Sequence, residues 1–234
     1  MQSAAQQVLG AALRMEGGDV HLCNAYSLSL AERDSDYRLG LQGAFLNLPD
    51  GMSVVWASRV LRATPPLKER VYGPTLFLDV VRLGQQSHLK HYLYGATDDV
   101  LAKLRAELQR HAPDAEFVAS EAPPFRPLTQ KEERDLATRV SQSGAHIVWV
   151  GLGTPKQDWF GVTMRNRVPA VTVAVGAAFE FIPGLKPQAP QWMQLRGLEW
   201  AFRLMTEPRR LWRRYLIGNS AFLFAVLRQR VREG

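Results

Sequence analysis

The chain has 234 residues, of which 46% are hydrophobic and 22% charged, and it carries a net charge of +7. This composition is ordinary for a folded globular protein and excludes a disordered or low-complexity chain. A single cysteine excludes an internal disulfide, and no run approaches the roughly 20 apolar residues that a membrane-spanning helix needs.

Residues 1–18 are rich in glutamine and alanine and show a helical pattern with one arginine. They lack the basic start and the long apolar core of a secretion signal, so we expect the protein to stay in the cytoplasm. The next apolar run contains Cys23, which we expect to be a buried strand thiol.

Apolar runs of strand length then alternate with longer segments of helical periodicity. This alternation predicts an α/β fold with a parallel sheet and crossover helices. Two helix starts are also predicted, one capped by Thr97 and one at Thr129, where Glu132 completes a capping box. The six predicted strands are residues 20–24, 45–48, 91–95, 116–120, 146–151 and 170–175.

Three polar residues stand near strand ends or helix starts. Asn24 ends the first strand, where its amide can bind a sugar or cap the next helix, and both alternatives stay open. Asp50 follows the second strand and can act as a general base for a hydroxyl. Pro-Asp-Gly is also a common turn, in which the aspartate caps a helix and Gly51 takes a positive φ. Arg70, before the helix start at Gly73, can neutralise a diphosphate or lie on the surface.

The segment 148–159 predicts a strand that ends in glycines and a helix capped by Thr154, with a proline at its first position. Backbone amides at such a place bind phosphates or ribose hydroxyls. The structural alternative is a capping box between Thr154 and Gln157, and the third glycine of a dinucleotide fingerprint is absent. The candidate ligand-contacting residues are Gly153, Lys156 and Gln157.

The residues after 182 change in character, from a proline-punctuated linker at 182–190 to helical and basic sequence. We therefore predict a catalytic core at 1–182 and an appendage of two or three amphipathic helices at 183–234. From residue 191 onward there are nine arginines and three acids, a net charge of +6.

Arg209 with Arg213, and Arg210 with Arg214, repeat a four-residue spacing without acids to neutralise them. Like charges at this spacing destabilise an isolated helix, so we expect an external anion as their partner. Aromatic and leucine side chains lie between them and favour a membrane surface. The candidates to hold diphosphates of the donor or the lipid are Arg203, Arg209, Arg210 and Arg214.

Two other charged clusters have purely structural explanations. Arg196, Glu199 and Arg203 recur at i, i+3 and i+7 and can form a salt-bridge ladder on one helix face. Asp34 and Asp36 resemble a metal-binding acid pair, but no apolar strand precedes them, so we expect a solvated loop. The five histidines show no ligand spacing, and no metal site is expected.

Taken in order, these motifs resemble the WecG/TagA/CpsF family of bacterial glycosyltransferases, glycosyltransferase family 26. The resemblance runs from about residue 20 to residue 222, and the ordered set is specific although each motif alone is weak. The matching segments are Asn-Ala at 24–25, PDG at 49–51, RVYG at 70–73, GLGTPKQ at 151–157, VGAAFEF at 175–181, APQWMQLRGLEW at 189–200, and the arginine-rich run that ends at 215.

The resemblance implies a Rossmann-like α/β core and an inverting, metal-independent reaction without a cofactor. It implies transfer of a sugar from a UDP-sugar to a polyprenyl-diphosphate-linked sugar, in bacterial cell-surface polysaccharide or teichoic acid biosynthesis. Asp50 matches the proposed catalytic base, and Arg70 and Gln157 match pocket residues. The appendage is expected to dock on the anionic inner face of the cell membrane and to cover the active site with arginines, which stabilise the departing diphosphate.

The chain departs from the family pattern at Leu22, where many relatives have Thr, at Asp158, where Glu is usual, and at Gln188, where Arg is usual. These changes bear on which sugar is accepted and leave the proposed base and arginines intact. The resemblance also implies a strand or hairpin before the first helix, which we expect to be missing here.

Two other functions remain alternatives. A basic nucleic-acid-binding α/β protein fits the charge and the interleaved aromatics, although the apolar run at 221–227 and the lack of a binding motif argue against a nucleic-acid partner. A nicotinamide-dependent oxidoreductase is disfavoured because Gly-Leu-Gly comes late in the chain. The sequence leaves open the sugar, the nucleotide, the acceptor and the oligomeric state, including a homo-oligomer.

Overall fold

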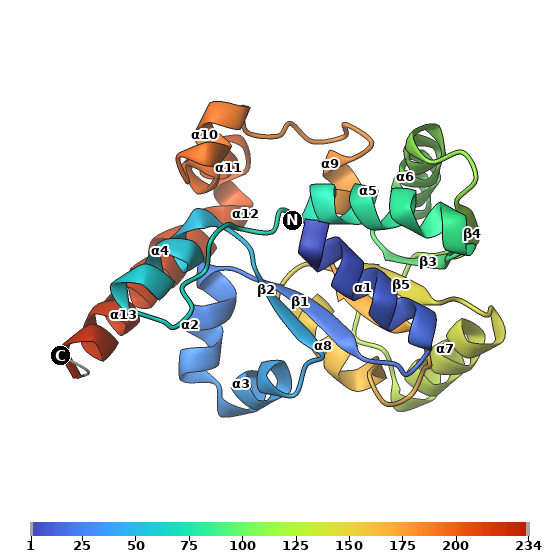
Figure 1. Cartoon of the computed structure of the whole chain (residues 1–234), viewed down its shortest axis with the longest axis horizontal. Helices are drawn as coiled ribbons and strands as arrows, with labels where there is room; N and C mark the ends of the chain where they lie inside the picture. Colours follow the sequence, from blue (N-terminus) through green and yellow to red (C-terminus); the bar gives the residue numbers. More distant parts are fainter. Residues whose placement is uncertain (1, 233–234) are drawn as a thin grey trace.

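The computed structural model describes residues 2–232 and contains a six-stranded sheet between two layers of helices (Figure 1). All neighbouring strands pair in parallel, in the order β2-β1-β6-β5-β3-β4. Each predicted strand is confirmed to within one residue at either end, and so is the α/β fold class. The strands are β1 Asp19–Cys23, β2 Leu46–Pro49, β3 Lys90–Gly95, β4 Glu116–Glu121, β5 Ile147–Gly151 and β6 Val171–Ala174.

Helices cover both faces of this sheet. α1, α5 and α6 pack on one face, and α7 and α8 pack on the other, where α3 adjoins α8. The helices of the core are α1 Gln2–Arg14, α2 Ala25–Arg33, α3 Ser35–Gln42, α4 Met52–Val60, α5 Gly73–Gly84, α6 Asp98–His111, α7 Gln130–Gln142, α8 Lys156–Met164 and α9 Ala178–Phe181, with a 3₁₀ turn at Gln85–Ser87.

The central strand β5 shows how the two layers are filled. Ile147 and Trp149 pack among the side chains of α1, α5 and α6, whereas Val148 and Val150 pack against α7 and α8. Successive side chains of a strand point to opposite faces. Because both faces are covered, the strand is apolar throughout, as is typical of a parallel sheet.

The predicted helix caps are confirmed at two places. The Thr97 hydroxyl accepts a hydrogen bond from the first turn of α6, and Thr129 and Glu132 form the capping box of α7. Asp34 is exposed and lies between two helices, as expected of a solvated loop, whereas Asp36 lies in the first turn of α3. The Asp34 carboxylate accepts hydrogen bonds from two backbone amides and caps α3.

The described part of the C-terminal appendage, residues 183–232, folds back over the carboxyl edge of the sheet. Its last helix lies beside α4 and α2 at the left of Figure 1, and Phe222 is buried there against Ala25 and Ala57. The division into 1–182 and 183–234 as two domains stays a prediction. The helices of the appendage are α10 Gln191–Leu195, α11 Glu199–Thr206, α12 Pro208–Trp212, a π-helical segment η2 at Arg213–Asn219, and α13 Ser220–Arg232.

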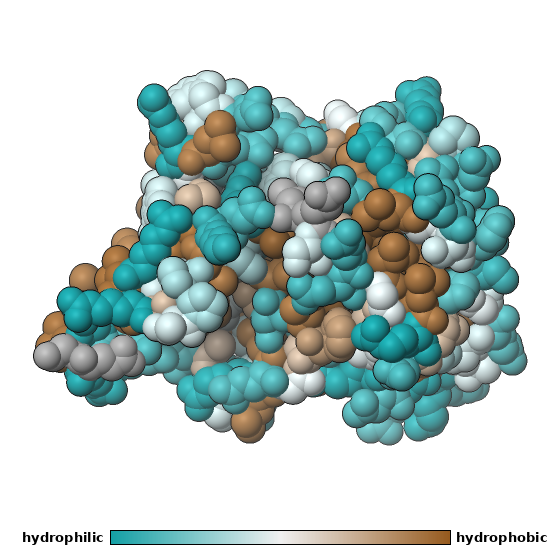
Figure 2. Space-filling model, viewed as in Figure 1, coloured by the Kyte–Doolittle hydropathy of each residue, from teal (hydrophilic) through white to brown (hydrophobic). Residues whose placement is uncertain are grey.

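The appendage also exposes many apolar side chains. In Figure 2, hydrophobic residues (brown) and hydrophilic residues (teal) adjoin one another over the α13 end of the molecule. No helix within residues 2–232 combines the length and the apolar character needed to cross a bilayer. The exposed apolar residues of the appendage include Trp192, Leu195, Trp200, Met205, Trp212, Leu216, Ile217, Leu223, Phe224, Leu227 and Val231.

Candidate functional site

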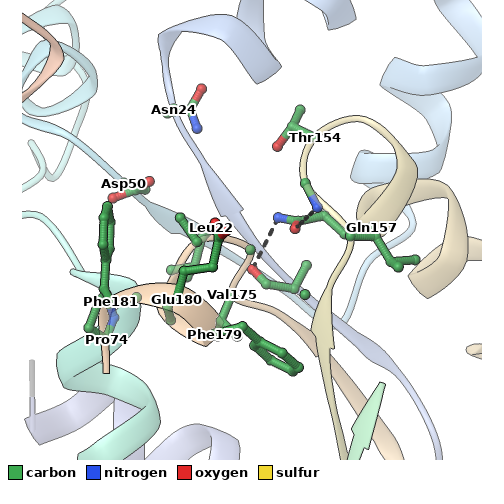
Figure 3. A pocket seen from close by; sticks show the side chains of 18 of the residues that line it. Leu22, Asn24, Asp50, Pro74, Thr154, Gln157, Val175, Phe179, Glu180 and Phe181 are labelled. Atoms are coloured by element: carbon green, nitrogen blue, oxygen red, sulfur yellow. Dashed lines mark hydrogen bonds between the residues drawn. The ribbon is translucent and has the colours of Figure 1, made fainter. Parts of the chain in front are cut away.

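The residues that follow β1, β2, β5 and β6 meet at one edge of the sheet, because parallel strands place their carboxyl ends together. A cavity of about 470 Å³ opens at this edge, the position where open α/β sheets bind ligands. Asn24, Asp50 and Gln157 surround it, with Asp50 and Gln157 on opposite sides in Figure 3. The structure therefore brings together side chains that are far apart in the sequence.

Asp50 is held in place by its backbone. Its amide donates a 2.8 Å hydrogen bond to the carbonyl oxygen of Cys23, which continues the pairing of β2 with β1. Gly51, the residue before α4, has a φ of +96°, and no side chain caps this helix. The predicted positive φ is confirmed, but the predicted aspartate cap is wrong, so the Asp50 carboxylate is directed to the cavity instead.

Burial raises the pKa of Asp50 to about 6, and the neighbouring carboxylate of Glu199 adds to the rise. The positive charges of Arg70, Arg203 and Arg214 oppose it. A carboxylate with this pKa is ionised at neutral pH and is a stronger base than an exposed aspartate.

Asn24 caps α2, as one of its two sequence interpretations predicted. Its side-chain oxygen accepts hydrogen bonds from the amides of Tyr26, at 3.0 Å, and Ser27, at 3.3 Å. Asn24 also lines the cavity, so the cap leaves its NH₂ group available to a ligand.

The loop after β5 is held by hydrogen bonds of the Gln157 side chain rather than by a cap at Thr154. The Gly153 amide donates to Gln157 Oε1 at 2.9 Å, and Gln157 Nε2 donates to the Ala174 carbonyl at 3.5 Å (Figure 3). The predicted cap at Thr154 and the predicted capping box are wrong, since α8 begins at Lys156 without a side-chain cap. Gly153 and Gln157 line the cavity, whereas Lys156 does not.

A second cavity, of about 430 Å³, adjoins the first between α4 and the appendage. Its walls are largely apolar and include Met52, Trp56, Val60, Trp200 and Leu223. Asp50 therefore lies where a polar cavity meets an apolar one. The residues that line both cavities are Asn24, Tyr26, Asp50, Glu199, Arg203 and Arg214.

The four candidate arginines of the appendage differ in their positions. Arg203 and Arg214 line both cavities, and each has a buried Nε without a hydrogen-bond acceptor among residues 2–232. Arg210 lines the polar cavity but pairs with Glu207, at 2.6 and 2.8 Å, so the expectation that this arginine lacks an acidic partner is wrong. Arg209 is exposed and lines neither cavity.

Arg70 binds the appendage. Its Nη1 lies 2.6 Å from Glu199 Oε2, its Nη2 donates to Gln194 Oε1 at 2.9 Å, and its guanidinium lies 4.8 Å from the centre of the Tyr72 ring. The surface alternative for Arg70 is wrong, because its side chain is 13% exposed. The predicted ladder on α11 is also wrong, because Glu199 pairs with Arg70.

Sequence reasoning missed several residues that line the cavities. Tyr26 follows Asn24 by two residues and was detectable as part of the same helix start. Glu199 had no such signal, since its partner Arg70 lies 129 residues away. The other missed residues include Tyr72, Glu180 and Tyr215.

Within the described residues, no three His, Cys, Asp or Glu side chains come together in a group that could hold a metal ion.

Comparisons with known proteins show which family this sequence resembles. The model of the glycosyl transferase WecG/TagA/CpsF family matches residues 1–234. An N-acetylglucosaminyldiphosphoundecaprenol N-acetyl-beta-D-mannosaminyltransferase of Bacillus spizizenii is 32% identical over 85% of this chain and 74% of its own length. A protein of the same name from Bacillus subtilis is 30% identical over 80% of this chain and 70% of its own length. The chain therefore belongs to the WecG/TagA/CpsF family of glycosyltransferases.

Proposed function

We propose that this protein transfers N-acetylmannosamine from a UDP-sugar to N-acetylglucosamine linked to a polyprenyl diphosphate. The observation that carries this assignment is the position of Asp50 at the meeting of a polar and an apolar cavity. A nucleotide sugar suits the first cavity, and an acceptor with a lipid chain suits the second. The names of the two Bacillus relatives support the choice of sugar and acceptor.

The donor occupies the polar cavity. Gly153 and Gln157 stand at the carboxyl edge of the sheet, the position where α/β folds bind nucleotides. Asn24 contacts the sugar near Asp50, and Arg203, Arg210 and Arg214 approach from the appendage. We assign no contact to Lys156 or Arg209, because they line neither cavity.

In the reaction, the Asp50 carboxylate takes the proton of the acceptor hydroxyl. The acceptor oxygen attacks the anomeric carbon of the donor, and the bond from that carbon to the phosphate oxygen breaks. UDP leaves with the bonding electron pair, and the configuration at the anomeric carbon is inverted. General base catalysis of this kind contributes about 10²–10⁴ in rate.

Guanidinium groups take the place of a divalent cation at the leaving group. Arg203 and Arg214 each carry a buried Nε without a protein acceptor, and both line the cavity that we assign to the donor. Charge-assisted hydrogen bonds from such groups stabilise a departing diphosphate. We therefore propose a metal-independent reaction.

The acceptor places the protein at the membrane. We propose that it acts peripherally on the inner face of the cell membrane, in the synthesis of a cell-surface polysaccharide or teichoic acid. The exposed apolar residues of the appendage, which adjoin its arginines, support this location.

The test is turnover of UDP-N-acetylmannosamine with a polyprenyl-diphosphate-N-acetylglucosamine acceptor in the presence of EDTA. Released UDP and the glycolipid product are measured, and NMR of the product gives the anomeric configuration. We expect β-linked product and a loss of about 10²-fold or more for Asp50→Asn.

Substrate binding separates a lost base from a lost fold. Asp50→Asn should retain the rise in melting temperature that the UDP-sugar produces in the wild-type protein. Near-normal turnover by Asp50→Asn, a strict requirement for magnesium or manganese, or retention of configuration would each contradict the proposal.

A further inference from the structure

The guanidinium of Arg70 is held by the appendage. Glu199 of α11 and Gln194 of α10 bind its two terminal nitrogens, and the Tyr72 ring covers its face. Arg70 itself belongs to the core, in the segment between α4 and α5. This contact therefore joins the core to the appendage beside the reactive carboxylate.

The Asp50 carboxylate has several charged neighbours and no direct partner. Throughout residues 2–232, no hydrogen bond or ion pair joins this carboxylate to another side chain. Glu199 and Arg70 line the apolar cavity together with Asp50. The groups that interact with its charge are Glu199 and Arg203 of α11, Arg214 and Tyr215 of η2, Arg70 and Tyr72 of the segment before α5, and Cys23 of β1.

We infer that Glu199 is a positioning residue for Asp50. By binding the Arg70 guanidinium, Glu199 keeps Arg70 from forming an ion pair with the Asp50 carboxylate, which stays free to accept a proton. The inference rests on the proposed role of Asp50 as the base. It adds that the Asp50 carboxylate is free to accept a proton only when the appendage has docked on the core.

A direct ion pair between Arg70 and Asp50 would weaken the base. An arginine next to an aspartate lowers the pKa of that aspartate by about 1–3 units. A base with a lower pKa is less effective in taking a proton from a hydroxyl. Glu199 thus keeps the pKa of Asp50 from falling, because it holds Arg70 away from the Asp50 carboxylate.

The chain offers a matched control in Glu207. This residue reaches the core through Lys186, which is itself part of the appendage: Glu207 Oε2 lies 3.0 Å from Lys186 Nζ, and Lys186 Nζ lies 2.7 Å from Glu180 Oε2 of α9. Glu207 lines neither cavity and does not contact Arg70. Glu199→Gln removes the ion pair with Arg70, whereas Glu207→Gln removes the ion pairs with Lys186 and Arg210 and leaves Arg70 held.

The experiment is a ¹³C NMR titration of the Asp50 carboxyl group in the full chain, with its signal assigned by its absence in Asp50→Asn. We expect Glu199→Gln to lower the pKa of Asp50 by about one unit or more, and Glu207→Gln to leave it at the wild-type value. An unchanged pKa in Glu199→Gln, or an equal fall in both variants, overturns the inference.

A double variant tests whether the effect passes through Arg70. Loss of the Glu199 charge alone also lowers the pKa of Asp50, so Glu199→Gln is repeated in an Arg70→Gln background. We expect only a small further change there. A fall as large as in the wild-type background would show a direct effect and would overturn the role of Arg70.

The rate profile provides the functional readout. In Glu199→Gln the acid limb of kcat/KM should move to lower pH together with the pKa of Asp50, and kcat at high pH should fall by about tenfold. Glu199→Asp, which keeps a carboxylate, should restore part of the position of the acid limb and part of kcat at high pH. The NMR titration needs no substrate, so a titration that behaves as expected beside an inactive wild-type protein would overturn the proposed function alone.

Discussion

Arg214 combines burial with incomplete hydrogen bonding. Its guanidinium lies 5.2 Å from the centre of the Tyr26 ring and 5.9 Å from that of Tyr215, and its Nε is buried without an acceptor in the described chain. Burial lowers the pKa of Arg214, and the positive charge of Arg203 lowers it further. A buried donor without an acceptor costs free energy, so this geometry favours an anionic ligand.

We predict that Arg214→Lys raises the KM for the UDP-sugar about tenfold. Lysine keeps the charge but loses the planar array of donors that binds two phosphate oxygens at once. Initial rates at varied donor concentration measure the effect. Arg213→Lys is the control, because Arg213 is exposed and lines neither cavity, and an equal rise in KM for this variant would contradict the assignment.

A buried charged cluster connects β1 to α8. His21 Nε2 lies 2.7 Å from Asp19 Oδ2, and His21 Nδ1 lies 3.1 Å from Asp158 Oδ1. Tyr37 donates to Asp158 at 2.9 Å, and Arg165 pairs with Asp19 at 2.7 Å. Burial opposes the charge of His21, but hydrogen bonds with Asp158 and Asp19 outweigh it and raise the pKa of His21 above 6.5.

We predict that His21→Gln lowers the free energy of unfolding by about 3 kcal/mol at pH 6, because it leaves buried Asp158 without a positive partner and Asp19 with Arg165 alone. A raised folded-state pKa stabilises the fold below the unfolded pKa of about 6.5, and this contribution is lost as the pH rises through the folded-state value. Urea unfolding of both proteins at pH 6 and pH 9 checks this. A difference between them that does not shrink at pH 9 would argue against a charged His21.

Sequence predicted the residues of the site that follow strands. Asn24 and Asp50 stand directly after β1 and β2, so the strand pattern alone places them at one edge of the sheet. Glu199 and its contact with Arg70 were not predictable, since nothing local links residues 129 positions apart. Arg210 pairs with Glu207 at a three-residue spacing, which the four-residue pattern of the arginines does not predict.

The appendage approaches α4 closely at one glycine. A Cβ atom at Gly197, which has a φ of +69°, would lie 2.6 Å from the Trp56 ring and 3.1 Å from Met52 Cβ. Both neighbours belong to α4, and both line the apolar cavity. The segment between α10 and α11 can therefore seat against α4 only without a side chain at this position.

We predict that Gly197→Ala loosens the appendage, because overpacking of this kind costs about 1–3 kcal/mol. Hydrogen exchange in α11 should become faster while exchange in β5 stays unchanged. Gly184→Ala is a close control, since Gly184 has the same φ of +69° and nothing lies within 4 Å of its Cβ position. If hydrogen exchange in α11 is equally fast in Gly197→Ala and Gly184→Ala, backbone strain alone explains the effect.

Strands and caps were easier to predict than the shape of the appendage. Buried strands in a parallel sheet are continuous apolar runs, and Thr97 and Thr129 have the local sequences that caps require. At Thr154 the local pattern failed because the Gln157 side chain binds the Gly153 amide instead. The π-helical segment η2 was not predicted, since its Gly218 packs against Tyr26 of a distant helix.

At the scale of the whole molecule, charge and apolar surface are concentrated at one end. The appendage carries most of the net positive charge, and α13 exposes Leu223, Phe224 and Leu227 beside Arg228 and Arg230. Interleaved apolar and basic side chains bind anionic bilayers by burial and by attraction together. This arrangement favours a membrane surface over a nucleic acid, whose backbone offers no partner for the apolar residues.

We predict that the triple substitution of Leu223, Phe224 and Leu227 by serine weakens binding to anionic liposomes at least tenfold. These side chains are each more than half exposed, so their replacement removes apolar area from the membrane contact without opening the core. Co-sedimentation with phosphatidylglycerol vesicles measures binding. Raising the salt concentration should weaken the binding of the wild-type protein to these vesicles, because salt screens the charges of the arginines.

The control is Phe125→Ser, which removes a side chain that is 95% exposed in the loop between β4 and α7. It should leave liposome binding unchanged, because this loop belongs to the core rather than to the appendage. Unchanged binding by the triple variant would reject α13 as the contact. Salt-sensitive binding of the wild-type protein to oligonucleotides, without binding to vesicles, would instead favour the nucleic-acid alternative. Attraction to phosphates needs only the arginines, whereas docking on a bilayer needs the apolar residues as well.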